Sequence, residues 1–194
     1  MSEVNLPIAL DGLKGYLEER LDERLLDIKK EIKESLGDED LKLIWMTVDR
    51  DDFRDAVKVI SEIQKPHLSV ASGSDKGDHI ELIYHFQVNY SYPGKETAVN
   101  LKVHLPKDDP TLPTITDIIP GAIMTEREKQ EMLGVDIIDI PDSRRMWLGD
   151  EYPEDKYPWR WDDEGMEDIS HHPHDAEEAP KEPTAHNPRK RGEE

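Results

Sequence analysis

Residues 79–105 read HIELIYHFQVNYSYPGKETAVNLKVHL, and this stretch decides the fold. It holds two strand-like runs, 79–90 and 97–105, with the turn sequence YPGK at 92–95 between them. A third strand-like run, 67–71, precedes them across a short loop that contains glycine and serine. Because both connections are short, the three runs predict an antiparallel meander.

The residues before this meander predict one more strand and a helix. The run 41–48, LKLIWMTV, alternates in character and is rich in strand formers. Between 53 and 63, apolar side chains recur on one helical face, and Pro66 ends that helix. One helix on three or four strands makes two layers. We therefore predict an α+β domain over 39–149, with one or two helices on a small, mostly antiparallel sheet.

The N-terminal residues 1–38 predict one long amphipathic helix. Leucine and isoleucine recur every three or four residues from Leu10 to Leu36, in a sequence otherwise full of charges. Gly37 is a suitable residue to end that helix. The narrow stripe is explained either by packing on the helix's own domain or by docking on another subunit.

Composition excludes several classes of protein. The 194 residues include 45 acidic and 25 basic side chains, for a net charge of −20, and no cysteine. The charge argues against nucleic-acid binding, and the missing thiolates exclude disulfides, a cysteine nucleophile and the usual ligands of iron–sulfur clusters. No apolar run is long enough to span a bilayer, and the N-terminus lacks the layout of a signal peptide. High charge and few amides are also typical of thermophile proteins.

The C-terminal quarter predicts an arm and a tail. Residues 150–169 form an extended segment punctuated by proline, and the tail 170–194 has no Val, Leu, Ile, Phe, Trp or Tyr. Such a tail cannot bury enough apolar surface to order itself, so we predict disorder. The arm's aromatic residues must lie across a surface, either of their own domain or of a neighbour, and we favour a neighbour. They are Tyr152, Tyr157, Trp159 and Trp161.

Signatures of catalysis are missing. The chain contains no GxGxxG, GxxxxGK[ST], HExxH or GxSxG sequence. The four histidines between 67 and 104 show no metal-ligand spacing, so we interpret them as structural or exposed. Three tail histidines beside Asp168 or Asp175 leave open a metal site, and with it a small hydrolase, as a minor alternative. They are His171, His172 and His174.

The sequence Thr125-Glu126-Arg127-Glu128 predicts the start of a helix. Thr125 at the N-cap and Glu128 three residues later satisfy the capping-box rule, and Gly134 is suited to end the helix. The helix start explains both glutamates better than acid–base catalysis does.

These residues also carry a family resemblance. LPTITDIIPGA at 112–122, TERE at 125–128, Gly134-Val135 and PDSRR at 141–145 resemble the hallmark of the 30-kDa subunit of respiratory complex I. That family includes the equivalent subunit of membrane-bound, complex I-like hydrogenases. The resemblance covers about residues 41–161, and the order of strand, helix, meander and motif is similar too.

The sequence departs from the family hallmark at several positions. Met124 replaces tryptophan, Leu133 replaces phenylalanine and Ile140 replaces histidine, while Glu131 lies one position further from the glycine than the pattern expects. These departures favour a divergent branch, such as the archaeal membrane-bound hydrogenases or sulfane-sulfur reductases.

The resemblance implies a non-catalytic subunit of a multi-subunit oxidoreductase, without a cofactor of its own. Its partners would be the large subunit related to nickel–iron hydrogenases and the iron–sulfur subunits, at the cytoplasmic face of the membrane and attached only through them. An acidic adaptor that binds one protein partner is the alternative. We expect removal of Arg127 to weaken the complex. The residues expected at the interface or in the motif's structure are Glu126, Arg127, Glu128, Gly134, Pro141, Asp142, Arg144, Arg145, Tyr157, Trp159 and Trp161.

Overall fold

The computed structural model describes residues 5–35, 39–65, 67–149 and 152–161. All of them belong to one compact unit. The predicted tail 170–194 and its histidines lie outside the described residues, so the predictions of disorder and of a metal site there stay predictions. Within the described ranges, no helix is both long enough and apolar enough to cross a bilayer.

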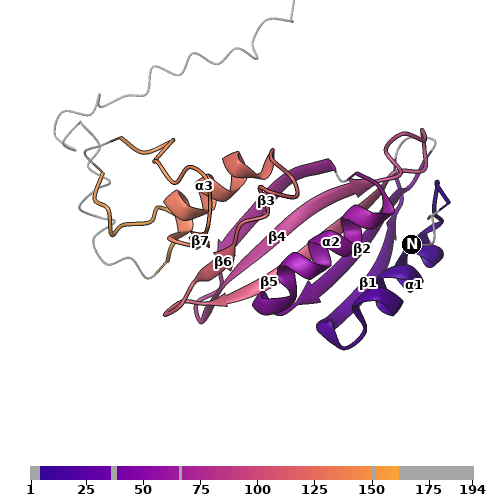
Figure 1. The fold of residues 1–194 in the computed structure, drawn as a ribbon, viewed down its shortest axis with the longest axis horizontal. Helices are drawn as coiled ribbons and strands as arrows, with labels where there is room; N and C mark the ends of the chain where they lie inside the picture. The colour runs from indigo at the N-terminus through magenta and orange to yellow at the C-terminus, as the bar shows by residue number, and fades with distance from the viewer. Residues whose placement is uncertain (1–4, 36–38, 66, 150–151, 162–194) are drawn as a thin grey trace, which may run out of the picture. The chain divides into compact units, whose positions relative to one another are not determined.

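A five-stranded sheet forms the centre of the fold (Figure 1). Its strand order is β1-β2-β5-β4-β3; the β2–β5 pair is parallel, and the other pairs are antiparallel. The predicted meander is confirmed as β3-β4-β5, and the predicted strand 41–48 is β2. The strands are β1 (Leu25–Lys33), β2 (Leu41–Val48), β3 (His67–Asp75), β4 (His79–Val88) and β5 (Thr97–Pro106).

All three helices cover the same face of this sheet. Alternate residues of β4, from Ile80 to Val88, are buried against them, and the rings of Phe53 and Tyr84 lie 4.8 Å apart between α2 and β4. Figure 1 shows α2 lying across the central strands. The predicted two-layer α+β class is confirmed. The helices are α1 (Leu10–Leu21), α2 (Phe53–Ile63) and α3 (Ala122–Leu133).

The prediction of one helix over 1–38 is wrong. Helix α1 ends at Leu21, where Asp22 adopts a positive φ of 45°, and after a 3-10 turn (η1, Asp22–Arg24) the chain continues as β1. Strand β1 lies at the sheet edge, and its register shifts between Leu25 and Asp27. The half-buried side chains of this strand are Leu25, Ile28 and Glu31, whereas Ile32, a member of the predicted apolar stripe, is 59% exposed. Pairing with β2 is a tertiary interaction that outweighs this local pattern.

A second, two-stranded sheet connects α3 to the rest of the fold. Strand β6 (Thr111–Pro113) pairs in parallel with β7 (Asp136–Ile138), and α3 lies between them in sequence. A second 3-10 turn, η2 (Arg50–Asp52), precedes α2. Arg50 donates to Asp109 and Thr111, and Arg54 forms a two-pronged ion pair with Asp117. These contacts fix the segments before and after β6, which lead to the start of α3.

Candidate docking face around the third helix

Helix α3 begins one turn before the predicted start. Its N-cap is Gly121, so Thr125 lies inside the helix and the predicted capping box is wrong. The Thr125 hydroxyl instead accepts from the Ala71 N–H at 2.8 Å and donates to the Ala71 carbonyl at 3.0 Å. The Thr125 hydroxyl therefore bonds the edge of β3 rather than capping the helix as the capping rule predicted.

Glu126 points into the core and not toward a neighbour. Its carboxylate accepts hydrogen bonds from the Thr114 hydroxyl at 2.6 Å and the Ile115 N–H at 3.0 Å, while the Tyr84 hydroxyl lies at 3.5 Å. Burial raises the pKa of Glu126, and these donors oppose that shift only in part. Glu126 therefore ties the loop after β6 to α3 and to the sheet.

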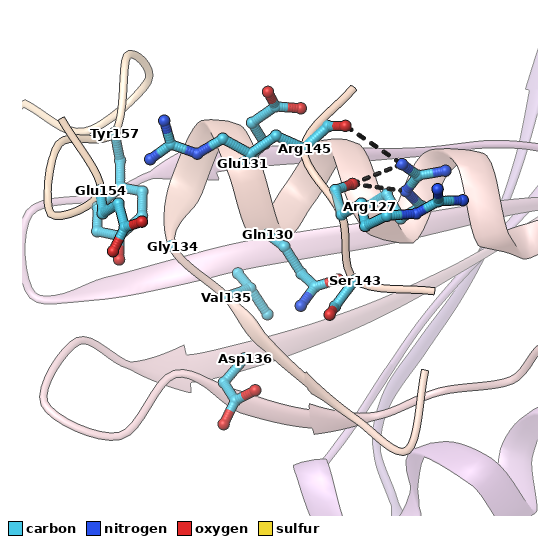
Figure 2. Close-up of a pocket in the computed structure, with 11 residues that line it drawn as sticks. Arg127, Gln130, Glu131, Gly134, Val135, Asp136, Ser143, Arg145, Glu154 and Tyr157 are labelled. Atoms are coloured by element: carbon cyan, nitrogen blue, oxygen red, sulfur yellow. Dashed lines mark hydrogen bonds between the residues drawn. The ribbon is translucent and has the colours of Figure 1, made fainter. Parts of the chain in front are cut away.

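Arg127 holds the loop that carries the paired arginines. Its guanidinium donates to the carbonyl of Arg144, with Nε at 2.9 Å, and to that of Arg145 at 3.3 Å (Figure 2). Asp142 lies 3.4 Å from the same guanidinium and also pairs with Arg144. The guanidinium of Arg144 holds the pKa of Asp142 well below its usual value. The motif arginines thus stabilise their own chain.

Glu131 fastens the next part of that loop. Its carboxylate accepts the backbone N–H groups of Met146, Trp147 and Leu148. Burial would raise the pKa of Glu131, but these three donors and Arg145 together lower it. Sequence analysis identified Glu131 only as a motif member, because no local pattern predicts that one carboxylate accepts hydrogen bonds from amides 15 to 17 residues away.

The C-terminal arm, as far as the structure describes it, lies on its own domain. The N–H of Trp159 donates to the Met132 carbonyl at 2.9 Å, and Arg160 donates to the Leu133 carbonyl at 2.7 Å. Arg145 donates to the carbonyls of residues 152 and 153. For 152–161, the backbone of the arm therefore lies on its own domain, and the contact with a neighbour that we favoured stays a prediction for the exposed side chains. The backbone carbonyls at the end of α3 are free to accept, as at any helix end, and the arm supplies the donors.

Gly134 makes this close approach possible. It ends α3 as predicted, in the left-handed conformation with φ 64°. A Cβ atom at this position would lie 2.5 Å from the Tyr157 ring. Gly134 thus ends the helix and, because it has no side chain, leaves room for the Tyr157 ring.

A lysine and an aspartate complete the attachment of the arm. Lys129 is buried, pairs with Glu128, and lies 4.8 Å below the Trp159 ring. At the end of β3, the side chain of Asp75 is fully buried, accepts the Trp161 N–H at 3.0 Å, and pairs with Lys107 at 2.8 Å. Sequence analysis missed Asp75 and assigned it to a loop. The one local clue is the spacing of Asp75 and Gly77, which is typical of an Asx turn; in the structure the Gly77 N–H donates to Asp75.

A cavity of about 270 Å³ lies between α3, the arginine loop and the arm (Figure 2). It brings together Arg127, Gly134, Arg144, Arg145 and Tyr157 from the predicted residues. Glu126 faces the core, and Pro141 is exposed. In the parts of the chain that the structure describes, no three metal-ligating side chains gather, and the four strand histidines lie apart from this cavity. The contacts around this cavity fix the loop and the arm on α3.

Three tryptophans near α3 and β3 are exposed on a fixed backbone. The exposed fraction is 61% for Trp147, 40% for Trp159 and 89% for Trp161. The backbone N–H of each tryptophan is held by α3 or by β3. Aromatic side chains that are held in place but left uncovered are typical of binding hot spots.

Comparison with known proteins identifies the family. A model described as respiratory-chain NADH dehydrogenase, 30 Kd subunit, matches residues 46–168. The chain is 36% identical over 124 residues to the membrane-bound hydrogenase subunit beta of Pyrococcus furiosus, covering 63% of this chain and 71% of that protein. It is 30% identical over 128 residues to formate hydrogenlyase subunit 5 of Escherichia coli, covering 61% of this chain but 22% of that relative.

The fold is shared with a solved structure. A chain from the membrane-bound sulfane sulfur reductase, an archaeal respiratory membrane complex, superimposes with a TM-score of 0.62 at 22% identity. The match covers 81% of this chain and 86% of that chain. With a family model that spans well over half of the sequence, the resemblance is confirmed, and the chain belongs to the family of the 30-kDa subunit of the respiratory-chain NADH dehydrogenase.

Proposed function

We propose that this protein is a structural subunit in the peripheral arm of a membrane-bound, complex I-like oxidoreductase. It carries no redox group and docks on the large subunit related to nickel–iron hydrogenases, near the iron–sulfur subunits, at the cytoplasmic face of the membrane. The family and its relatives among hydrogenase and respiratory complexes support this assignment.

The observation that carries the proposal is the way the domain occurs in its relatives. In Pyrococcus furiosus it accounts for most of a separate subunit, whereas in Escherichia coli it matches only about a fifth of a longer chain, formate hydrogenlyase subunit 5. A domain that occurs both alone and within a larger polypeptide is expected to contact the rest of that polypeptide when the two are separate chains. We therefore expect this chain to bind directly to the subunit that corresponds to the rest of that longer polypeptide.

The chemistry of the chain supports a role without electron transfer. It contains no cysteine, so the thiolates that hold iron–sulfur clusters would come from other subunits. The buried carboxylates of Glu126, Glu131 and Asp75 bind backbone N–H groups of the loops and the arm. The exposed tryptophans on this fixed backbone are the face that we assign to the large subunit.

Purification from membranes tests the proposal. The tagged full-length chain should be extracted with a mild detergent and the co-purifying chains identified by mass spectrometry. We expect the large hydrogenase-like subunit and iron–sulfur subunits in fixed ratio, with crosslinks from Trp147 or Trp159 positions to the large subunit. Recovery of the chain alone, from the soluble fraction, would contradict the proposal.

A further inference from the structure

The face of the sheet opposite the helices carries a groove. No described helix covers this face, on which alternate residues of β2, β5 and β4 are half-buried or exposed. At the end where β2 begins, a groove of about 420 Å³ has an apolar floor and an acidic rim. The floor includes Leu41, Leu43 and Ala98, and the rim includes Glu39, Asp40 and Glu96.

The polar groups beside this floor already satisfy one another. Asn100 donates its amide to the Ile44 carbonyl, so its Oδ1 accepts from His85 Nδ1 at 2.7 Å. The other ring nitrogen of His85 then accepts from the Ser72 hydroxyl at 2.8 Å. An apolar side chain can therefore lie on the floor without leaving these groups unpaired.

The rim has an excess of negative charge. Its three carboxylates face one lysine, Lys42, whose ammonium donates to the Gly94 carbonyl at 2.8 Å and lies 3.9 Å from Glu39. A second copy of this chain, with a net charge of −20, would be repelled from such a rim. Charge complementarity requires an occupant that brings cations.

We propose that the groove holds an extended, basic segment of another subunit of the complex. In an extended segment, successive side chains point to opposite sides, so an aliphatic residue can lie on the floor while adjacent lysine or arginine residues reach the rim. This inference rests on the proposed function, because it takes its partner from the same complex.

A photo-crosslinking residue at Leu41, in the intact complex purified from membranes, tests the groove. Leu41 is 59% exposed, and Leu26 on β1 is a matched control at 58%. We expect Leu41 to crosslink to a peptide of another subunit that contains lysine or arginine within two residues of the crosslink, and Leu26 not to capture that peptide. Crosslinks from Leu41 to a second copy, to the chain itself, to a peptide without basic residues, or to nothing would overturn the assignment.

Charge reversal tests the rim separately. Asp40→Lys with Glu96→Lys should lower the yield of the Leu41 crosslink about tenfold, and Glu19→Lys with Glu23→Lys, two exposed positions outside the groove, should leave it unchanged. An equal yield in both pairs would refute the role of the rim. If the complex purifies intact without the crosslink, only the groove assignment fails. If the chain purifies alone, the proposed function fails with it.

Discussion

At the residue scale, three acidic side chains accept hydrogen bonds from backbone N–H groups, which helices and strands satisfy elsewhere in the fold. Glu131 accepts three consecutive backbone amides, Asp75 accepts the amide of Trp161, and Glu126 accepts that of Ile115. Each joins α3 or β3 to a segment that has few backbone partners of its own. Charged acceptors form stronger hydrogen bonds than neutral ones, so few contacts suffice.

Removing the Glu131 carboxylate should release the loop that follows Arg145. In Glu131→Ala, three amides lose their acceptor, and we expect a loss of about 2 kcal/mol or more in the free energy of unfolding. Denaturant unfolding measures that loss, and hydrogen exchange should show faster exchange at 146–148. Glu19→Ala, on the exposed side of α1, is the control. Unchanged exchange at 146–148 would refute the role of Glu131.

Glu126 makes stability depend on pH in a predictable direction. Burial raises its pKa, so the folded protein binds this proton more tightly than the unfolded chain does. Its contribution is fully present below the unfolded pKa and is lost as pH rises through the folded value. Above the usual glutamate pKa of about 4.3, the wild type should therefore lose stability relative to Glu126→Gln. Unfolding free energies measured on both proteins across this range give the test; parallel curves would contradict it.

At the scale of elements, the junction of α3 with the arm depends on one glycine. Gly134→Ala adds a Cβ that meets the Tyr157 ring and places a side chain at positive φ, a conformation that alone costs about 1–2 kcal/mol. We expect the melting temperature to fall by several degrees and the tryptophan fluorescence to change as the arm separates.

Gly121→Ala is the matched control for that substitution. Gly121 also adjoins α3, but its φ is −67° and no atom lies within 4 Å of a Cβ built there. Its melting temperature should stay within about a degree of the wild type. Equal effects of the two substitutions would show that the contact with Tyr157 is unimportant.

The elements that the sequence predicted correctly are those whose pattern and packing agree. Strand β2 and helix α2 each bury one face against the core, so the period along the sequence matches the period of burial. Strand β1 violates this rule, because Leu25, Ile28 and Ile32 keep a helical spacing in the sequence although Ile32 is 59% exposed at the sheet edge. Periodicity alone could not distinguish it from a continuation of α1.

The candidate site was predictable in its residues and not in their contacts. Four of the motif residues line one cavity: Arg127, Gly134, Arg144 and Arg145. Arg127 and Arg145 donate to backbone carbonyls, however, and a backbone atom leaves no signature in the side-chain sequence. For the same reason, the attachment of Trp161 to Asp75, 86 residues away, could not be foreseen.

At the scale of the whole molecule, the arginine loop should affect assembly without touching a cofactor. Arg127 is 13% exposed and donates to two carbonyls, so Arg127→Ala frees the loop beside the proposed docking face. We expect the yield of co-purified complex to fall severalfold, with unchanged iron per assembled complex. Arg144→Ala is the control, because its side chain is 84% exposed and pairs with Asp142. Normal assembly of the Arg127 variant would contradict this prediction.

The Thr125 hydroxyl also affects how the exposed edge of β3 behaves before the chain binds its partners. A bare sheet edge is a template for unwanted strand pairing and aggregation. At Ala71, in the middle of β3, both outward backbone groups are taken by Thr125, and the opposite edge, β1, carries lysines at positions 29, 30 and 33. We therefore expect the newly made chain to resist edge-to-edge pairing at both edges of the sheet: the Thr125 side chain blocks the middle of β3, and the lysines repel other strands from β1.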